Sequence, residues 1–214
     1  MSHTAAIFDI DGVIVDSGPI HLQAWKEVLK NHGIIADDME FRRLFGMRDS
    51  EVIPRLIENN SDEQVKEFMR EKSLVFKGFI TNIARPIPGV VECIERLLAH
   101  DIHLAFASLA TPEEIATILK KVGLEDRVPV VVTGENPMRD KPAPDIFLTA
   151  AYRMGIEPEN IVVFEDDIAG VEAARIAGAT AIAITTSYAP GELSHADLVI
   201  QDFLDPKIYQ FFNM

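Results

Sequence analysis

Beyond residue 86 the chain alternates between short apolar runs and amphipathic helical patterns, and this alternation limits the possible folds more than any other feature. The apolar runs are strand-sized and span 102–107, 128–133, 160–164 and 179–184. The helical patterns span 90–100, 112–122, 144–154 and 169–177, and a weak strand at 197–200 and a C-terminal helix follow. Continuously apolar strands are typical of parallel sheets, whose crossover helices cover both faces. The sequence therefore predicts an α/β fold with a Rossmann-like, doubly wound parallel sheet.

The first part of the chain predicts one strand and then helices alone. The run AAIFDI indicates a buried strand that ends near Asp9, and residues 18–32 have helical spacing. Residues 37–83 contain no strand pattern and carry the inner faces of several helices. The turn-rich stretch Arg-Pro-Ile-Pro-Gly at 85–89 then marks a hinge. We therefore expect two domains, which are a core of residues 1–15 and 86–214 and an inserted helical cap domain of residues 16–85.

Composition and charge argue against several kinds of protein. Hydrophobic residues make up 48% and charged residues 25% of the chain, which is ordinary for a globular protein. The formal net charge of −14 argues against nucleic-acid and anionic-membrane partners, which bind basic surfaces. No apolar run is long enough to span a bilayer, and the N-terminus lacks the basic and apolar stretches of a secretory signal. We therefore expect a cytoplasmic protein, and we interpret its one cysteine, Cys93, as a small helix residue.

Polar side chains follow the predicted strands at the points where the strands end. They are Asp9 and Asp11 after the first strand, Ser108 after the second, Glu165, Asp166 and Asp167 after the fourth, and Lys141 in a loop. Ligands of open parallel sheets bind beyond the carboxyl ends of the strands, so we expect these side chains to converge. Several carboxylates in one crevice repel one another unless a cation lies among them, and hard oxygen ligands favour Mg²⁺. The sequence therefore predicts a magnesium site.

Each of these residues has a simpler interpretation when it is taken alone. A single Asp at a strand end is at least as often a turn residue or a helix N-cap. Pro142 and Pro144 favour a helix start, but they do not explain Lys141 between them, because a helix N-terminus disfavours a cation. A bound anion would supply the missing counter-charge. The whole set is poorly explained by turns and caps.

Four segments, in order, resemble the four signatures of the haloacid dehalogenase superfamily. They are DIDGVIVDS at 9–17, the strand-terminal Ser108, the loop KPAPDIF at 141–147 and FEDDIAGVEAARIAGA at 164–179. The resemblance covers essentially the whole chain. It is greatest to the β-phosphoglucomutase-like group of sugar-phosphate phosphatases and mutases, whose small helical cap enters at the same point as residues 16–85 here.

The resemblance implies how the core residues act on a phosphate ester. Asp9 is the nucleophile and forms an aspartyl-phosphate. Asp11 is the general acid for the leaving oxygen and then the base for the incoming water or hydroxyl, so it must be protonated when the substrate binds. Ser108 and Lys141 bind phosphoryl oxygens, and the lysine also offsets the negative charge around Asp9.

The resemblance also implies the metal ligands. Mg²⁺ is held by a carboxylate oxygen of Asp9, the main-chain carbonyl of Asp11 and the carboxylate of Asp166, with Glu165 nearby. Asp167 stands where the family often has a small polar residue, and it is assigned no role.

Four residues of the predicted cap are candidates for contact with the substrate. Lys72 falls on the apolar stripe of a helix near 64–80, where it either extends into solvent from the edge of the stripe or contacts the substrate, as a cap lysine does in the family. Arg48 either reaches the substrate, as the resemblance suggests, or pairs with a neighbouring acid in solvent. His21 and Trp25 lie one helical turn apart, where a similar pair lines the entrance in relatives, although cap packing is the simpler interpretation of Trp25.

Two activities fit these residues. The first is a Mg²⁺-dependent phosphatase acting on a small phosphate monoester, such as a sugar phosphate, and the second is a β-phosphoglucomutase-type phosphomutase. In the mutases a further serine and a basic residue follow the strand-terminal serine and help to hold a second phosphate. Here Ser108 is followed by Leu-Ala-Thr-Pro, which favours the phosphatase. Arg48 and Lys72 would still be able to hold a distal phosphate, so the mutase stays open.

A phospho-receiver signalling domain is the non-enzymatic alternative, because it also gathers acids, a hydroxyl residue and a lysine around Mg²⁺. The order along the chain favours the enzyme. The acceptor Asp of a receiver follows a later strand, whereas Asp9 ends the first strand and Asp11 adds an acid that a long-lived phosphoprotein would lack.

Overall fold

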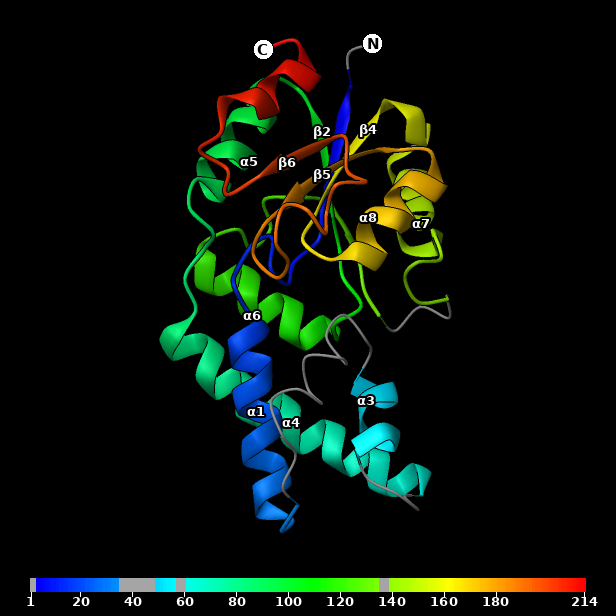
Figure 1. The fold of residues 1–214 in the computed structure, drawn as a ribbon. Helices are drawn as coiled ribbons and strands as arrows, with labels where there is room; N and C mark the ends of the chain where they lie inside the picture. The colour runs from blue at the N-terminus through cyan, green and yellow to red at the C-terminus, as the bar shows by residue number, and fades with distance from the viewer. Residues whose placement is uncertain (1–2, 35–48, 57–60, 135–138) are drawn as a thin grey trace.

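A computed structural model describes residues 3–34, 49–56, 61–134 and 139–214. Its centre is a sheet of six parallel strands in the order β3-β2-β1-β4-β5-β6. The strands are β1 Ala5–Phe8, β2 His103–Ala107, β3 Val130–Val132, β4 Ile161–Glu165, β5 Thr180–Ile184 and β6 Leu198–Ile200. The order reverses at β1, from which the chain winds outward in both directions (Figure 1). The predicted α/β class with a doubly wound parallel sheet is confirmed.

The register of the central strands puts their carboxyl ends level with one another. Phe8 of β1 pairs with Phe106 of β2 on one side and with Phe164 of β4 on the other. The Phe8 ring also stacks on the Phe164 ring at 4.5 Å between centroids. The residues that follow these three strands therefore emerge together at one edge of the sheet.

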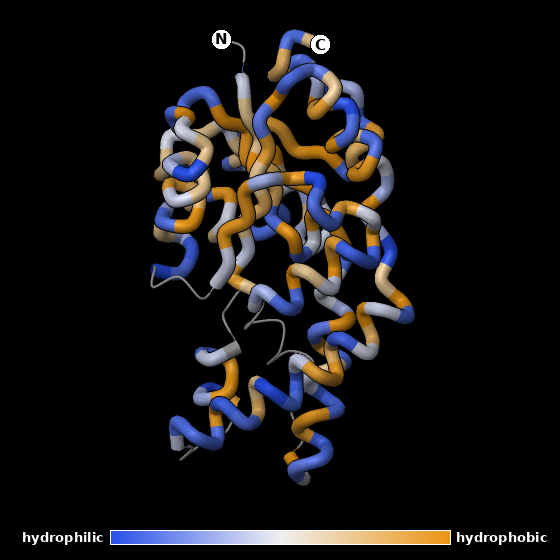
Figure 2. Tube along the Cα trace, turned by 180° about the vertical axis from the view of Figure 1, so that it is seen from behind, coloured by the Kyte–Doolittle hydropathy of each residue, from blue (hydrophilic) through white to orange (hydrophobic). Residues whose placement is uncertain are grey.

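Helices cover both faces of the sheet. Alternate strand residues point to opposite sides, so both faces carry apolar side chains that the helices bury. Ala6 and Phe8 pack in the cluster that contains α5, α6 and η2, whereas Ala5 and Ile7 pack in the cluster that contains α7 and α8. These elements are α5 Val90–Leu98, α6 Pro112–Val122, η2 Pro206–Phe212, α7 Asp145–Met154 and α8 Ile168–Ala177. Burial of one large side chain such as Phe8 contributes about 1.5–3 kcal/mol, so these two clusters fix the positions of the strand ends. The hydrophobic strands lie between more hydrophilic helices in Figure 2.

The remaining helices lie below the sheet in Figure 1 and form a group of their own. They are α1 Gly18–Asn31, α3 Asp49–Leu56 and α4 Asp62–Ile83. Trp25 of α1 packs with Ile53 of α3 and Phe68 of α4 in a separate hydrophobic cluster. Helix α4 begins with a capping box, in which Ser61 and Gln64 each accept a hydrogen bond from the backbone N–H of the other. The proposed cap limits of 16 and 85 remain a prediction.

Two segments of the described chain form 3-10 helices. The C-terminal segment 206–212 is a 3-10 helix, since seven residues rich in aromatic and branched side chains have low α-helix propensity. A short 3-10 helix, η1 (Pro158–Asn160), also precedes β4.

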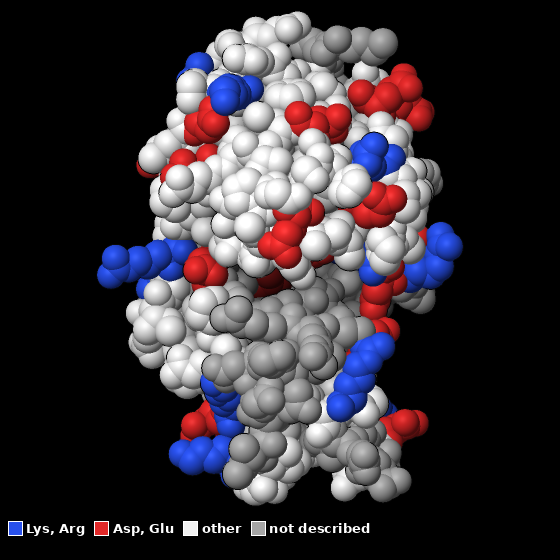
Figure 3. Space-filling view, in the orientation of Figure 1, with Lys and Arg blue, Asp and Glu red and all other residues white. Residues whose placement is uncertain are grey.

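Charge and hydropathy agree with the composition. In Figure 3 the Lys and Arg side chains on the visible face stand apart, among acidic ones, and form no continuous basic band among the described residues of that face. Within the described ranges, no helix is both long enough and apolar enough to cross a membrane.

Candidate active site

Asp9 follows β1 directly and lies against Lys141. The Lys141 ammonium donates a 2.8 Å hydrogen bond to Oδ1 of Asp9 and a second bond to Oε1 of Glu165 at the end of β4. The side chains of Lys141 and Asp9 are each 6% exposed. One buried cation thus joins the ends of two neighbouring strands, as expected for residues that surround an anionic substrate.

The carboxylates of this edge carry more negative charge than Lys141 offsets. Burial raises the pKa of Asp9 to about 6, although Lys141 acts in the opposite direction. Burial and the neighbouring carboxylates also raise the pKa values of Glu165 and Asp166 well above the ordinary range. Burial would lower the pKa of Lys141, but Asp9 and Glu165 outweigh it and raise that pKa. A further cation at this edge would relieve the repulsion.

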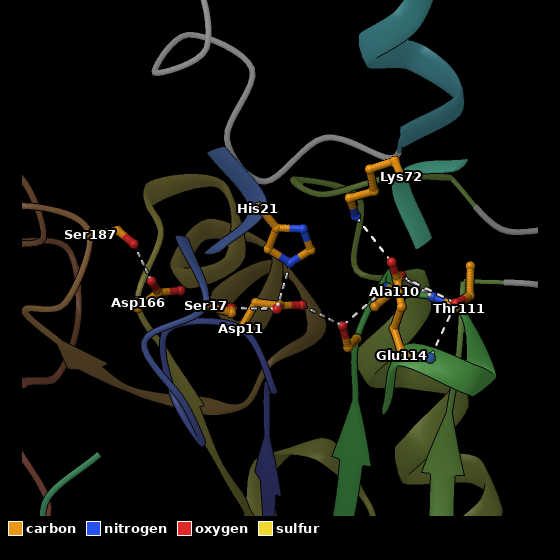
Figure 4. Close-up of polar contacts among 10 residues, drawn as sticks. Asp11, Ser17, His21, Lys72, Ala110, Thr111, Glu114, Asp166 and Ser187 are labelled. Carbon is orange, nitrogen blue, oxygen red and sulfur yellow. Dashed lines mark hydrogen bonds and ion pairs between the residues drawn. The ribbon is translucent and has the colours of Figure 1, made fainter. Parts of the chain in front are cut away.

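Asp11 lies two residues after Asp9 in the chain, and its carboxylate accepts three hydrogen bonds from side chains. Its Oδ1 is 2.5 Å from Oγ of Ser17 and 3.0 Å from Nε2 of His21, and its Oδ2 is 3.2 Å from Oγ of Ser108 (Figure 4). Burial would raise the pKa of Asp11, but the charge of His21 and the hydrogen bonds from His21 and Ser17 outweigh it and lower that pKa. The carboxyl is therefore ionised in this form, whereas the sequence reasoning required a proton when substrate binds.

Glu165, Asp166 and Asp167 form a cluster whose oxygen atoms lie within 4.8 Å of one another. A set of hard carboxylate oxygens suits Mg²⁺. Gly12 also fits such a site, because a Cβ atom at this position would lie 1.8 Å from Oδ2 of Asp166. The absence of that carbon allows Asp166 to lie against the loop that carries Asp11. The residues present therefore fit the predicted metal.

The structure adds residues that the sequence reasoning did not assign. Asp167 is the N-cap of α8, where its Oδ1 accepts a 2.7 Å hydrogen bond from the Gly170 N–H. Ser187, in the loop after β5, donates a hydrogen bond to Oδ2 of Asp166. Ser17 lies within the DIDGVIVDS motif, so its position was a signal, but no pattern in the sequence links Ser187 to Asp166.

Lys72 does lie on the inner face of α4, but it does not extend into solvent. Its side chain is 1% exposed, and its Nζ donates a 3.1 Å hydrogen bond to Oε1 of Glu114 on the core helix α6. The same Nζ lies 4.8 Å from the ring centroid of Phe76. The interpretation that Lys72 extends into solvent is therefore wrong, because the lysine pairs with the buried Glu114 of α6. Contact of Lys72 with substrate remains a prediction.

The other cap candidates are placed differently. His21 contacts Asp11, as described, and its ring stacks on Phe76 at 4.2 Å between centroids. Trp25 is 4% exposed and packs within the helical group, in agreement with the simpler interpretation. Arg48 lies outside the described residues. A role of these residues in substrate binding stays a prediction.

A family model for the haloacid dehalogenase-like hydrolases matches residues 6–184. The chain belongs to this family. Among haloacid dehalogenase-like relatives, a phosphorylated carbohydrates phosphatase of Thermotoga maritima is 34% identical over 178 residues, which are 81% of each chain. The fructose-1-phosphate phosphatase YqaB of Escherichia coli is 33% identical over 84% of this chain and 95% of its own. The beta-phosphoglucomutase of Bacillus subtilis is 27% identical over 94% of this chain and 90% of its own.

Solved structures of haloacid dehalogenase hydrolases have the same fold. A family IA, variant 3 hydrolase from Entamoeba histolytica superimposes with a TM-score of 0.89 and 27% identity, covering 100% of this chain and 98% of the other. The predicted membership of the phosphatase and phosphomutase group is confirmed, as is the prediction of an enzyme. The receiver alternative has no support from these relatives.

Proposed function

We propose that this hydrolase is a Mg²⁺-dependent phosphatase that acts on a small phosphorylated sugar or related metabolite through an aspartyl-phosphate on Asp9. The observation that carries the proposal is the position of Asp9. Its Oδ1 lies 2.8 Å from Nζ of Lys141, and Asp9 itself lies in the same loop as Asp11. A nucleophile, a fixed cation and an acid/base group thereby share one edge of the sheet.

Two steps complete the reaction. In the first, a carboxylate oxygen of Asp9 attacks phosphorus while the bond to the leaving oxygen breaks, and Asp11 supplies the proton to that oxygen. In the second, Asp11 removes a proton from water as the water oxygen attacks the aspartyl-phosphate, which releases inorganic phosphate and restores Asp9. Lys141 and Ser108 bind phosphoryl oxygens during both steps.

The carboxylates of Asp9 and Asp166 and the main-chain carbonyl of Asp11 would hold Mg²⁺, with Glu165 beside them. A metal ion held there would supply positive charge to offset the negative charge of the phosphoryl group. Ser187 orients Asp166 by its hydrogen bond.

Asp11 is ionised before the substrate binds, but the first step requires it to be protonated. Binding of the substrate therefore has to raise the pKa of Asp11. A phosphoryl group that arrives beside Asp11 brings negative charge, and a neighbouring like charge raises a carboxyl pKa. His21 and Ser17 therefore hold Asp11 in place before substrate binds, and the anionic substrate favours its protonation.

The named relatives point to phosphorylated carbohydrates, because two of them are phosphatases of this substrate class. A sugar phosphomutase is the second candidate, since one relative is a beta-phosphoglucomutase. The residues after Ser108 favour the phosphatase, because Leu109, Ala110 and Pro112 have no polar side chain for a second phosphate. In addition, the cation of Lys72 is already bound to Glu114.

A panel of phosphorylated metabolites tests the proposal, with phosphate release and isomerised product measured in the same reactions. We expect phosphate release from one or more sugar phosphates, and no turnover in Asp9→Asn, which keeps the shape of the side chain but loses the nucleophile. The panel includes β-glucose 1-phosphate with catalytic bisphosphate. Isomerisation faster than phosphate release would favour the mutase, and Asp9→Asn activity within tenfold of wild type would contradict the mechanism.

A further inference from the structure

The pair formed by Lys72 and Glu114 lies between the helical group and the core, close to Asp11. Glu114 belongs to the first turn of α6, which follows Ser108 and the end of β2. Ser108 itself donates to Asp11 at 3.2 Å, so the same segment contacts the acid/base residue and carries Glu114. Figure 4 shows Lys72 and Glu114 beside the group formed by Asp11, Ser17 and His21.

Both carboxylate oxygens of Glu114 are engaged, and they hold it in a fixed orientation. Oε2 accepts hydrogen bonds from the N–H of Thr111 at 3.3 Å and from its hydroxyl at 3.2 Å, in the capping box of α6. Oε1 faces the cap and accepts from Lys72 at 3.1 Å. The glutamate is 2% exposed and the lysine 1%. Because the helix cap anchors Glu114, it is Lys72 that is held in position.

The two members of the pair carry opposite charges. Burial would raise the pKa of Glu114, but Lys72 and then His21 outweigh it and lower that pKa, so the carboxylate is ionised. The positive charge of Lys72 is therefore cancelled locally. Among the described residues, His21, Asp11 and the rings of Phe76 and Trp25 also face this pair.

We propose that Glu114 determines the substrate class, by restricting the site to monophosphates with neutral, hydroxylated leaving groups and disfavouring substrates with a second phosphate. This inference rests on the proposed phosphatase function. A second phosphate beside Lys72 would lie next to a fixed carboxylate and would have to displace it, which costs free energy through repulsion. A sugar hydroxyl has no charge, and it is both a donor and an acceptor, so it is compatible with both members of the pair.

The test compares two substrates that differ by one phosphate. Wild type and Glu114→Gln are assayed with the monophosphate that the panel ranks first and with the bisphosphate of the same sugar; for fructose 1-phosphate, this is fructose 1,6-bisphosphate. Removal of the carboxylate charge leaves Lys72 positive. We therefore expect the ratio of kcat/KM for bisphosphate to kcat/KM for monophosphate to rise tenfold or more.

Glu113→Gln is the matched control, because Glu113 is exposed on the same helical turn and the substitution changes the charge equally. Its ratio should stay within twofold of wild type. In Glu114→Gln/Lys72→Met the rise should disappear, since the cation that attracts the second phosphate is gone. If Glu114→Gln does not fold, Lys72→Met alone supplies the test with the opposite sign, because loss of the cation that attracts the second phosphate should lower the ratio further.

A Glu114→Gln ratio within twofold of wild type, with monophosphate still hydrolysed, would overturn the inference and leave the phosphatase proposal in place. An unchanged ratio in Lys72→Met would overturn it equally. Absence of phosphate release from every monoester in the wild type would instead overturn the proposed function itself.

Discussion

Gly12 and Asp166 approach each other so closely that a Cβ atom at position 12 would displace the Asp166 side chain. A Cβ atom there would lie 1.8 Å from Oδ2 of Asp166, and the backbone of Gly12 has a φ of 72°. The short distance bears on the proposed metal ligand Asp166, and the positive φ bears on the stability of the backbone. Substitution of two different glycines distinguishes these two effects.

We expect Gly12→Ala to lose the stabilisation that Mg²⁺ gives, because the added methyl displaces Asp166. The positive φ alone costs roughly 1–2 kcal/mol for an L-residue. Thermal unfolding with and without Mg²⁺ measures both effects. Gly155→Ala is the matched control, because Gly155 has a φ of 69° with nothing within 4 Å of its Cβ position. A Mg²⁺-induced shift in Tm that is equal in Gly12→Ala and wild type would contradict this account of the site.

The convergence of the strand-end residues could be predicted because these residues adjoin strands in the chain, whereas Lys141 lies in the loop before α7. Asp9, Ser108 and Glu165 end or directly follow apolar runs, and the parallel order of β1, β2 and β4 brings them together. Contacts between distant segments had no such signal. Lys72 and Glu114 are 42 residues apart, and the capping pattern of Thr111 and Glu114 does not reveal which cation lies above it.

Lys141→Ala should reduce kcat by about two to three orders of magnitude, since one well-placed electrostatic contact is worth about 3–4 kcal/mol in a preorganised site. Steady-state kinetics on the best panel substrate measures the loss. Arg139→Ala is the control, because Arg139 is a cation in the same loop whose side chain is 76% exposed. Equal effects of the two substitutions would mean that Lys141 acts only through the general charge of the loop.

Removal of divalent metal should abolish turnover, and added Mg²⁺ should restore it. Burial and, after it, the neighbouring carboxylates raise the pKa values of Asp9, Glu165 and Asp166, and a bound cation would favour their ionised forms. Ca²⁺ should restore much less activity, because it prefers longer bonds and more ligands than Mg²⁺. Activity assays after chelation and dialysis check this, and full activity in excess chelator would remove the metal from the mechanism.

Cys93 should be inert in the folded protein. It is 0% exposed on α5, and burial raises the pKa of its thiol to about 12, so almost no reactive thiolate exists at pH 8. A chromogenic thiol reagent should therefore label it only after denaturation, with one equivalent per chain. Rapid labelling of the native protein, with no change in its circular dichroism, would show that α5 opens in solution.

Lys72→Met should destabilise the protein, because the substitution leaves Glu114 buried without its cation. Breaking one partner of a buried ion pair costs about 3–5 kcal/mol, whereas replacing both with apolar or neutral groups is often near neutral. Chemical denaturation of Lys72→Met, Glu114→Gln and the double variant measures the coupling. Arg70→Ala is the control on the same helix, because its pair with Glu67 is exposed and worth about 0–1 kcal/mol. Additive losses in the double variant would show that the pair contributes no coupling energy between α4 and α6.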